Sequence, residues 1–200
     1  MPYFTCQHHR IYYIIRGNLN RAPLLFFHGN TASLNMFEPL LPLYENSFCM
    51  ILIDFLRNGQ SESSQEEPFR PWYEEALQAA ALIRHLDLQN VNLVGVSAGA
   101  WAAVNTAMLL PERIGKVVAD SFGGLSLLRG SLSEMQAPIL LLGSREDELL
   151  QKDLEQEYVQ MAKEFPHADL HLFNTGSHPS LLSNAEAASK IIRHFLLLPG

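Results

Sequence analysis

One serine of this chain lies between two glycines, in a pattern that is typical of a reactive side chain. The segment Gly95-Val96-Ser97-Ala98-Gly99 follows an apolar run and precedes a stretch rich in small residues. A serine in a tight turn between a buried strand and a helix stands exposed above the sheet, and its neighbours must be small because the backbones pass close together. The helix start adds free N–H groups and a positive dipole end. We therefore predict that Ser97 is a nucleophile.

A serine hydroxyl needs a base within hydrogen-bond reach, and the base needs an orienting group. His178 lies in the loop after the last predicted strand, at the sheet edge where Ser97 is expected, so we predict that it is the base. The other seven histidines are His8, His9, His28, His85, His167, His171 and His194. Of these, the pair that flanks the last strand is too widely spaced on a strand to share a metal ion. We expect no metal site.

Short apolar runs that alternate with helical patterns predict the elements that position these groups. The predicted strands are Leu24–Phe27, Met50–Ile53, Val91–Val96, Val117–Ala119, Ile139–Leu142 and Leu170–Phe173. The predicted helices are Ser33–Leu43, Trp72–Leu86, Ala98–Leu110, Asp153–Phe165 and Asn184–Leu197. Strands that are apolar throughout and alternate with helices favour a mostly parallel sheet with helices on both faces. Tyr3–Gln7 and Arg10–Arg16 indicate an antiparallel N-terminal hairpin.

Several motifs stand in the order known from the α/β-hydrolase superfamily, which the chain resembles over nearly its whole length. They are His28-Gly29-Asn30-Thr31, the turn Asp54–Ser61, Gly95–Gly99, Gly143–Asp147 and Gly176-Ser177-His178. Each motif is weak alone, but together they are specific to the superfamily, although not to one substrate. The resemblance implies an α/β-hydrolase fold in a single domain over residues 1–200, with the activity of a serine hydrolase.

The resemblance also implies an acid that orients the histidine. The superfamily normally carries it in the loop after the penultimate strand, and that loop holds Asp147 here. The alternative is Asp120, at the end of the preceding strand, a position that some members use. The flanking Glu146 and Glu148 are weaker candidates.

Acyl transfer builds negative charge on the substrate carbonyl oxygen, and two backbone N–H donors usually stabilise it. We expect the donors to be the N–H groups of Ala98, directly after the serine, and of Asn30, in the element that resembles the superfamily's His-Gly-x. In this family the histidine of that element, here His28, is usually structural. Arg57 stands where the family's Asp-x-x-Gly turn has its first glycine, which puts the usual geometry of that turn in question.

The connection from Ser121 to Pro138 is short. Many members of the superfamily insert a helical cap there, but these residues leave room only for a turn or one short helix. We therefore expect a nearly absent cap and an open site. Its rim would be apolar, formed by Phe122, Leu125, Leu128 and Met135, and covered either by bulky esters or by a second copy of the chain in a homodimer.

Composition excludes several classes of partner. The 200 residues carry a formal charge of −7 and contain no Lys/Arg cluster that could follow the phosphates of a nucleic acid. No apolar run is long enough to span a membrane and the N-terminus does not resemble a signal peptide, so a cytoplasmic location is expected. Cys6 and Cys49 lie in apolar settings and are expected to be buried thiols. No dinucleotide or phosphate loop is present, and we expect no cofactor.

The expected function is hydrolysis of small or medium carboxylic esters through an acyl-enzyme on Ser97. Thioesterase, amidase and acyltransferase activities stay open because they pass through the same intermediate. A different class of function is a hydrolase-fold binding or scaffold protein with little activity.

Overall fold

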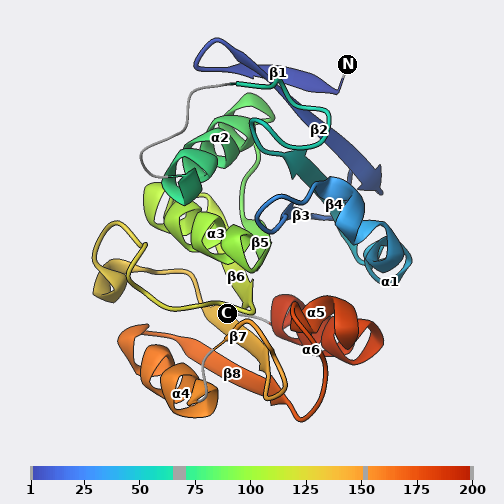
Figure 1. Cartoon of the computed structure of the whole chain (residues 1–200). Coiled ribbons are helices and arrows are strands. Elements are labelled where there is room, and N and C mark those ends of the chain that lie inside the picture. Colours follow the sequence, from blue (N-terminus) through green and yellow to red (C-terminus); the bar gives the residue numbers. More distant parts are fainter. Residues whose placement is uncertain (1, 65–70, 151–152, 199–200) are drawn as a thin grey trace.

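The computed structural model describes residues 2–64, 71–150 and 153–198. Within them lies an eight-stranded sheet in the order β1-β2-β4-β3-β5-β6-β7-β8 (Figure 1). The strands are β1 (Tyr3–Cys6), β2 (His9–Gly17), β3 (Ala22–Phe27), β4 (Phe48–Asp54), β5 (Val91–Val96), β6 (Ile114–Asp120), β7 (Ile139–Ser144) and β8 (Ala168–Phe173). Strands β3 to β8 pair in parallel, and the hairpin β1–β2 joins β4 antiparallel. Both the parallel sheet and the antiparallel hairpin are confirmed.

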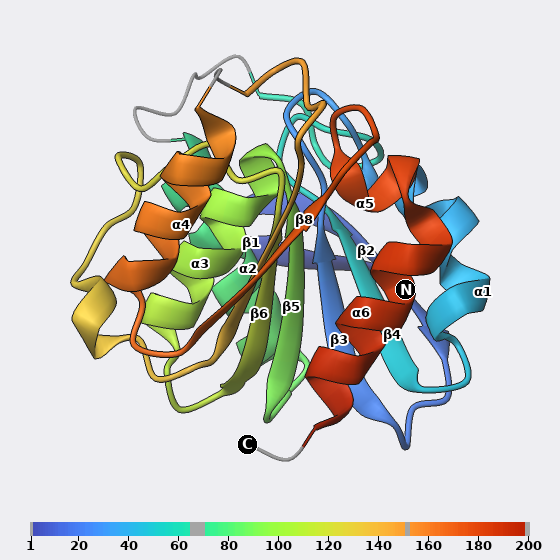
Figure 2. The same cartoon turned by 90° about the horizontal axis from the view of Figure 1, so that it is seen from below.

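Helices cover both faces of the sheet, as predicted. The helices are η1 (3-10, Leu34–Leu40), α1 (Leu41–Tyr44), α2 (Pro71–His85), α3 (Ala98–Leu109), η2 (3-10, Leu132–Glu134), α4 (Leu154–Glu164), α5 (Ser180–Ser183) and α6 (Ala185–Leu197). One core lies between the sheet and α2, α3 and α4, and the other between the sheet and η1, α1 and α6. Figure 2 shows the sheet between these two layers. Every residue of β4, β5 and β7 is buried, which explains why most of their positions are apolar.

The helix predicted from Ser33 to Leu43 takes a different form. It is a 3-10 helix over Leu34–Leu40, followed by one α-helical turn, and the Ser33 side chain makes no capping hydrogen bond. Pro39 lies inside the 3-10 segment and Pro42 in the α-helical turn. Proline removes a backbone N–H and clashes with the preceding turn, so a regular α-helix cannot run through this segment.

The connection between β6 and β7 contains only one short 3-10 helix, η2, which confirms the nearly absent cap. The expected apolar rim was partly wrong. Phe122 is fully buried and Met135 is 3% exposed, so both belong to the core. Leu125 and Leu128 are half-buried and pack against that core. Because the connection is too short to rise above the sheet, it turns its large side chains inward.

Two expectations from composition concern the whole chain. Cys6 and Cys49 are buried free thiols, as predicted. No helix in the described ranges has the length and hydropathy that a membrane span requires. The polar segment Ser61–Arg70 predicts a solvated loop, and residues 65–70 of that segment lie outside the described residues.

Candidate active site

Ser97 occupies a sharp turn between β5 and α3. Its backbone has φ 55° and ψ −120°, a conformation that is rare for a residue with a side chain. A Cβ on Gly95 would lie 2.3 Å from the backbone oxygen of Gly99, and one on Gly99 would lie 2.3 Å from that of Phe27. Both positions therefore need glycine. Ser97 is only partly buried, whereas its neighbours in β5 and α3 are buried, so the tight turn leaves the serine accessible.

A buried acid and a histidine meet in the loops after β7 and β8. Asp147 lies three residues beyond the end of β7, and His178 lies five beyond the end of β8. His178 Nδ1 is 2.8 Å from Asp147 Oδ2 and 3.0 Å from Oδ1. The Asp147 side chain is 0% exposed and that of His178 is 11% exposed. The contact fits an Nδ1–H that donates to the carboxylate, which leaves Nε2 able to accept a proton.

Ser97 and His178 belong to the same edge of the sheet. Strands β3, β5, β6, β7 and β8 are parallel, so their carboxyl ends lie together, and the segments with Ser97, Asp147 and His178 all follow such ends. Among the described residues, the Ser97 hydroxyl has no hydrogen bond to His178. In substrate-free enzymes, catalytic hydrogen bonds are often long and tighten when substrate binds.

Asp120, the alternative acid, makes different contacts. Its fully buried carboxylate accepts hydrogen bonds from Ser180 Oγ and, at 3.0 Å, from the Leu181 N–H. Next to it, Ser121 Oγ accepts a 3.0 Å hydrogen bond from the Ser180 N–H. Burial raises the pKa of Asp120 to about 7. Asp120 thus anchors the start of α5, directly after the segment that carries His178, while the imidazole pairs with Asp147.

The glutamates that flank Asp147 hold the histidine loop. Glu148 Oε2 accepts a 3.1 Å hydrogen bond from the backbone N–H of His178, and Glu146 Oε2 accepts a 3.4 Å bond from that of Gly176. Hydrogen bonds from its own N–H and from that of His178 lower the pKa of Glu148. The sequence analysis missed this positioning role. The one sequence feature that points to this role is the run of three acidic residues in one loop. That run does not show which group each carboxylate contacts.

The segment expected to supply an oxyanion donor lies against the serine. A Cβ on Gly29 would be 3.5 Å from Ser97 Cβ, so the loop after β3 touches the turn that carries Ser97. Asn30 follows in an exposed turn, and its N–H donates to no group in the described part of the chain. Ala98 is the first residue of α3, and the first N–H groups of a helix have no partner within it. Both backbone donors are thus free for a ligand.

His28 and the Asp54 turn have structural roles. The buried His28 accepts a 3.1 Å hydrogen bond from the Phe55 N–H, and its Nδ1 lies 2.9 Å from the Gly29 carbonyl oxygen. The Asp54 carboxylate accepts hydrogen bonds from the Leu34 and Gln60 N–H groups at 2.7 and 2.8 Å. Arg57 has φ 73°, the left-handed conformation that explains why glycine is usual there. The turn therefore forms despite the missing glycine.

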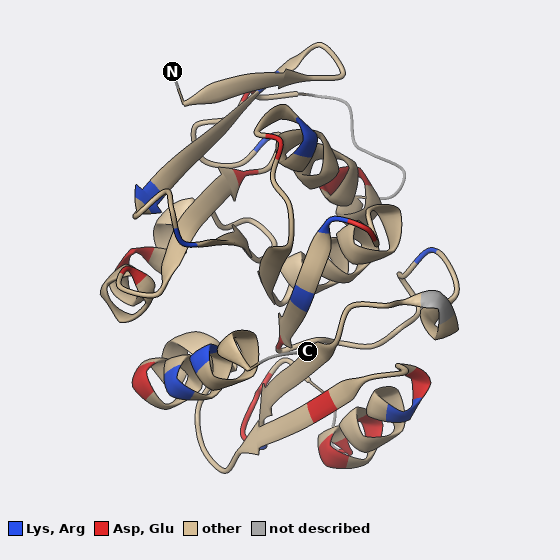
Figure 3. Ribbon diagram, turned by 180° about the vertical axis from the view of Figure 1, so that it is seen from behind, with Lys and Arg blue, Asp and Glu red and all other residues tan. Residues whose placement is uncertain are grey.

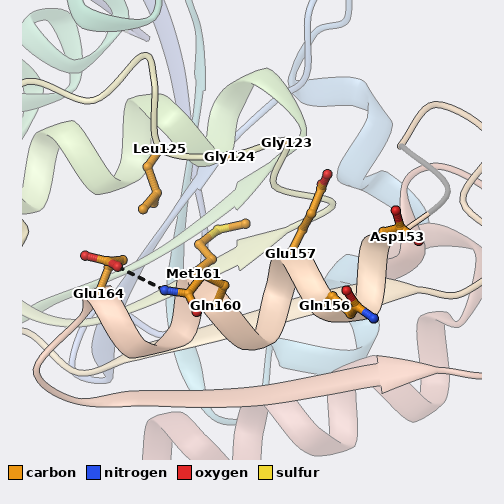
Figure 4. Close-up of a pocket in the computed structure, with 9 residues that line it drawn as sticks. All are labelled: Gly123, Gly124, Leu125, Asp153, Gln156, Glu157, Gln160, Met161 and Glu164. Atoms are coloured by element: carbon orange, nitrogen blue, oxygen red, sulfur yellow. Dashed lines mark hydrogen bonds between the residues drawn. The ribbon is translucent and has the colours of Figure 1, made fainter.

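Two cavities lie on the side of the site where a cap would attach. The smaller, about 230 Å³, is lined by Trp101, Phe122, Gly123, Leu149, Leu150, Glu157 and Tyr158. The larger, about 640 Å³, adjoins it at Gly123 and Glu157. There Leu125 points toward α4 and Met161 points toward the connection, while acidic and amide side chains of α4 line the opening (Figure 4). The smaller cavity is closer in sequence to Ser97 and Asp147, because Trp101 lies one helical turn after Ser97 and Leu149 lies two residues after Asp147.

The position of Trp101 at the start of the helix after Ser97 favours a core residue over a substrate contact. It packs against Trp72 and Phe122, with ring centroids 5.5 and 5.4 Å apart, and its Nε1–H donates to the Gly124 carbonyl at 2.8 Å. It also lines the smaller cavity, so the same side chain packs in the core and forms part of a cavity wall. Within the described residues, no group of three or more His, Cys, Asp and Glu side chains could hold a metal ion.

Curated relatives include hydrolases of several kinds. A Haemophilus influenzae protein named as a presumed esterase/lipase is 25% identical over 198 residues, which cover 86% of this chain and 68% of that protein. An uncharacterised hydrolase of Bacillus subtilis is 31% identical over 58% of this chain, and a proline iminopeptidase of Clostridium botulinum is 33% identical over 60%. The chain spans 42% of the length of each of these last two relatives.

Solved structures and a family model agree on the fold. An alpha/beta hydrolase enzyme from a deep-sea metagenome library superposes with a TM-score of 0.86 at 16% identity, over 99% of this chain and 98% of that one. Naproxen esterase from Bacillus subtilis superposes with a TM-score of 0.83 at 14% identity, over 96% and 90%. The family model of the alpha/beta hydrolase fold matches residues 22–126, more than half of the chain. The chain therefore belongs to the alpha/beta hydrolase fold family.

Proposed function

We propose that this protein is a serine hydrolase that cleaves small or medium carboxylic esters through an acyl-enzyme on Ser97. His178 is the base and Asp147 the acid that orients it. The observation that carries the proposal is the paired contact of His178 Nδ1 with both carboxylate oxygens of Asp147, at the sheet edge where the strained turn exposes Ser97. A carboxylate in this position fixes the tautomer in which Nε2 can accept the serine proton.

In the proposed reaction, Ser97 Oγ attacks the carbonyl carbon of the ester and transfers its proton to His178 Nε2. The N–H groups of Ala98 and Asn30 donate to the carbonyl oxygen as it gains negative charge. The tetrahedral intermediate collapses, and His178 returns the proton to the departing alcohol. Water then attacks the acyl-enzyme and gives a proton to His178. His178 returns this proton to Ser97 Oγ as the second tetrahedral intermediate collapses and releases the acid.

The cavities support the choice of substrate size. The acyl group would enter the smaller cavity beside Trp101, whose volume of about 230 Å³ suits a short chain. The carboxylates of Asp153, Glu157 and Glu164 along the larger cavity disfavour negatively charged substrates. Because the connection between β6 and β7 forms no cap, discrimination among short acyl chains should be weak, since one methylene is worth only about 1–3 kcal/mol in a pocket.

The test is a comparison of wild type and Ser97→Ala on matched acetyl and butyryl esters, thioesters and anilides with a chromogenic leaving group. We expect a burst of product with the esters, followed by steady turnover. Ser97→Ala should lower turnover by about a millionfold, to the limit of detection, without a change in the circular dichroism spectrum. Labelling of the intact protein by an organophosphonate should be lost in the same variant.

Different outcomes separate the alternatives. Preference for thioesters would make the chain a thioesterase, and a rate increase with added alcohol would indicate acyl transfer. A wild-type protein that neither turns over any of these substrates nor reacts with the organophosphonate would refute the proposal and favour a binding role.

A further inference from the structure

The last strand of the sheet, β8, has a partner strand on one side only. It ends the strand order, and in the described part of the chain it pairs with β7 alone. Figure 2 views the molecule from the other, free side of β8 and shows the strand in front, with α4 to one side and α5 and α6 to the other. Of its six residues only Phe173 is buried. The free side of β8 is therefore accessible to the strand of another chain.

The hydrogen bonds toward β7 show which backbone groups of β8 point outward. The Phe173 carbonyl oxygen accepts a 2.9 Å bond from the backbone N–H of Arg145, directly after β7. Successive residues of a strand direct their N–H and C=O groups to opposite sides, so those of Ala168, Leu170 and Leu172 point to the free side. The Leu172 carbonyl oxygen accepts a 3.1 Å bond from Arg145 Nη1 and keeps a second lone pair.

The side chains of β8 combine an acceptor and a donor on one face. Asp169 and His171 are two positions apart and so point to the same face of the sheet. The His171 ring packs on Phe173, with ring centroids 4.6 Å apart. Asp169 is exposed, is the strand's only Asp, Glu, Lys or Arg (Figure 3), and forms no ion pair within the described residues. A carboxylate accepts hydrogen bonds, whereas an imidazole has an N–H to donate and can carry a positive charge.

These two side chains favour one register if β8 pairs antiparallel with β8 of a second copy. Outward groups must face outward groups, so the twofold axis can pass through residue 169, 170 or 171. An axis at Asp169 places two carboxylates opposite each other, and an axis at His171 does the same with two imidazoles. With the axis at Leu170, each Asp169 faces the His171 of the other copy, and Ala168 pairs with Leu172. Like charges directly opposite destabilise a pair of strands and opposite charges stabilise it, so the axis at Leu170 is preferred.

A strip of apolar surface on α4 lies beside the free side of β8. Glu155 on α4 pairs with Arg145, with N–O distances of 3.0 and 3.1 Å, and Arg145 also reaches the outward Leu172 carbonyl. Val159 and Ala162 follow Glu155 by four and seven positions, which places them on the same side of the helix. Val159 is 42% exposed. A twofold axis perpendicular to the sheet brings both α4 helices to one face, where these strips meet.

We propose that the chain forms a symmetric homodimer in which the β8 strands of two copies pair antiparallel about Leu170 and join the two sheets. Two Asp169–His171 pairs set the register, and the Val159 side of each α4 adds apolar contact. This interface differs from the apolar rim near Ser97 that the sequence analysis considered. It does not depend on the proposed hydrolysis, because none of the three proposed catalytic residues lies on β8 or α4.

The first experiment measures the dimer Kd by sedimentation equilibrium at several protein concentrations. Asp169→His and His171→Asp each place like groups opposite each other and should raise the Kd at least about fivefold. The double variant exchanges the two groups and should return the Kd to within about twofold of the wild type. Glu112→His changes an exposed acid in the turn before β6 and should leave the Kd unchanged. Circular dichroism checks that each variant is folded.

The second experiment tests the register with cysteines. In the proposed pairing, residue 169 and residue 171 of the other copy form a pair without backbone hydrogen bonds, with Cα atoms about 4.5 Å apart. That separation is within the range of disulfides. A mixture of Asp169→Cys and His171→Cys should therefore crosslink on mild oxidation, while each variant alone should crosslink far less. The wild type gives the background, since its own Cys6 and Cys49 are buried.

Several results would overturn the proposal. One is a wild-type chain that stays monomeric at every concentration. Another is a dimer that Leu149→Ser dissociates while the β8 variants do not, because the interface would then lie at the rim. A double variant as weak as the single variants would refute the Asp169–His171 pairing. Crosslinking of either cysteine variant alone as readily as the mixture would refute the register about Leu170.

Discussion

Two buried aspartates stand near the histidine loop, and a pair of substitutions separates their roles. Asp147 contacts His178 Nδ1 through both oxygens, at 2.8 and 3.0 Å, whereas Asp120 accepts hydrogen bonds from Ser180 and Leu181. Asparagine has nearly the same shape as aspartate but no charge. In Asp147→Asn, an amide NH₂ that faces Nδ1 would stabilise the tautomer with its proton on Nε2, which cannot accept the serine proton.

The expected loss follows from that tautomer change. In comparable triads, replacing the acid with asparagine lowers kcat by about ten-thousandfold, which corresponds to about 5.5 kcal/mol of transition-state stabilisation. Asp120→Asn leaves the contact between His178 and Asp147 in place, but it weakens the hydrogen bonds that hold the start of α5. Its cost should appear in the free energy of unfolding, at about 1–3 kcal/mol for a buried hydrogen-bonded group, with kcat reduced by less than about tenfold.

The assay is kcat for a chromogenic butyryl ester at saturating concentration, with urea unfolding of each variant under the same conditions. Both variants should remain folded at the assay temperature, so that the comparison of kcat concerns chemistry alone. If folded Asp120→Asn lost activity by more than a hundredfold while Asp147→Asn lost less than tenfold, the acid would lie one strand earlier and this reasoning would be wrong.

Three further predictions concern the support of the site. Burial raises the pKa of Asp120 from 3.8 to about 7, so between these values the folded protein holds a proton that the unfolded chain has released. The free energy of unfolding should therefore fall as pH rises from about 4 to about 7, by an amount on the order of 4 kcal/mol at most. Urea unfolding at a series of pH values should show that this free energy depends less on pH in Asp120→Asn than in the wild type. Glu148→Ala should lower kcat several-fold, because the histidine loop loses a hydrogen-bond acceptor. Glu148→Gln keeps a carbonyl acceptor and should retain most of the activity. Equal losses of kcat in the two variants in steady-state assays would contradict this. Gly99→Ala would place a Cβ 2.3 Å from a backbone oxygen of β3 and should lower the free energy of unfolding by about 1–3 kcal/mol or more. In Gly29→Ala the added Cβ meets only ordinary contacts at 3.5 Å, so this variant is the control. An equal loss of unfolding free energy in the two variants, measured with denaturant, would refute the steric reasoning.

The expected homodimer and open rim would have fewer exposed apolar side chains than the sequence predicts. Phe122 and Met135 are core residues, and the exposed leucine nearest the site in sequence is Leu149, which is 69% exposed and follows Asp147 by two residues. Dimerisation stays a prediction, and light scattering at several concentrations would test it. A Leu149→Ser variant should weaken any dimer that forms through this edge.

The sequence by itself determined the sheet and the serine turn. Strands buried on both faces are apolar at most positions, and Val91–Val96, in which Asn92 is the one polar side chain, has the same bounds in the sequence pattern and in the structure. The turn around Ser97 was equally readable, because close backbone approach admits only small residues at Gly95 and Gly99. These are local requirements, so a short window of residues contains all of the information.

Tertiary structure alone decided which polar groups meet. Asp120 ends β6, and Glu146, Asp147 and Glu148 follow β7 at the same edge of the sheet. The sequence could rank these four acids only by resemblance to a family. In the structure, the Asp147 carboxylate contacts the His178 imidazole. The two glutamates accept hydrogen bonds from backbone N–H groups of the histidine loop, and Asp120 accepts one from the backbone of α5. The direction of a loop side chain depends on contacts between segments about 30 to 60 residues apart, and no periodic pattern records it.

The same reason explains the inward turn of Phe122 and the contact between Tyr44 and Ser189. Tyr44 and Ser189 are 145 positions apart in the chain and meet only because α1 and α6 cover the same face of the sheet. Burial and hydrogen-bond satisfaction are properties of the packed protein rather than of a segment. The sequence therefore fixes what each residue can do chemically, and packing decides which of these capacities is used.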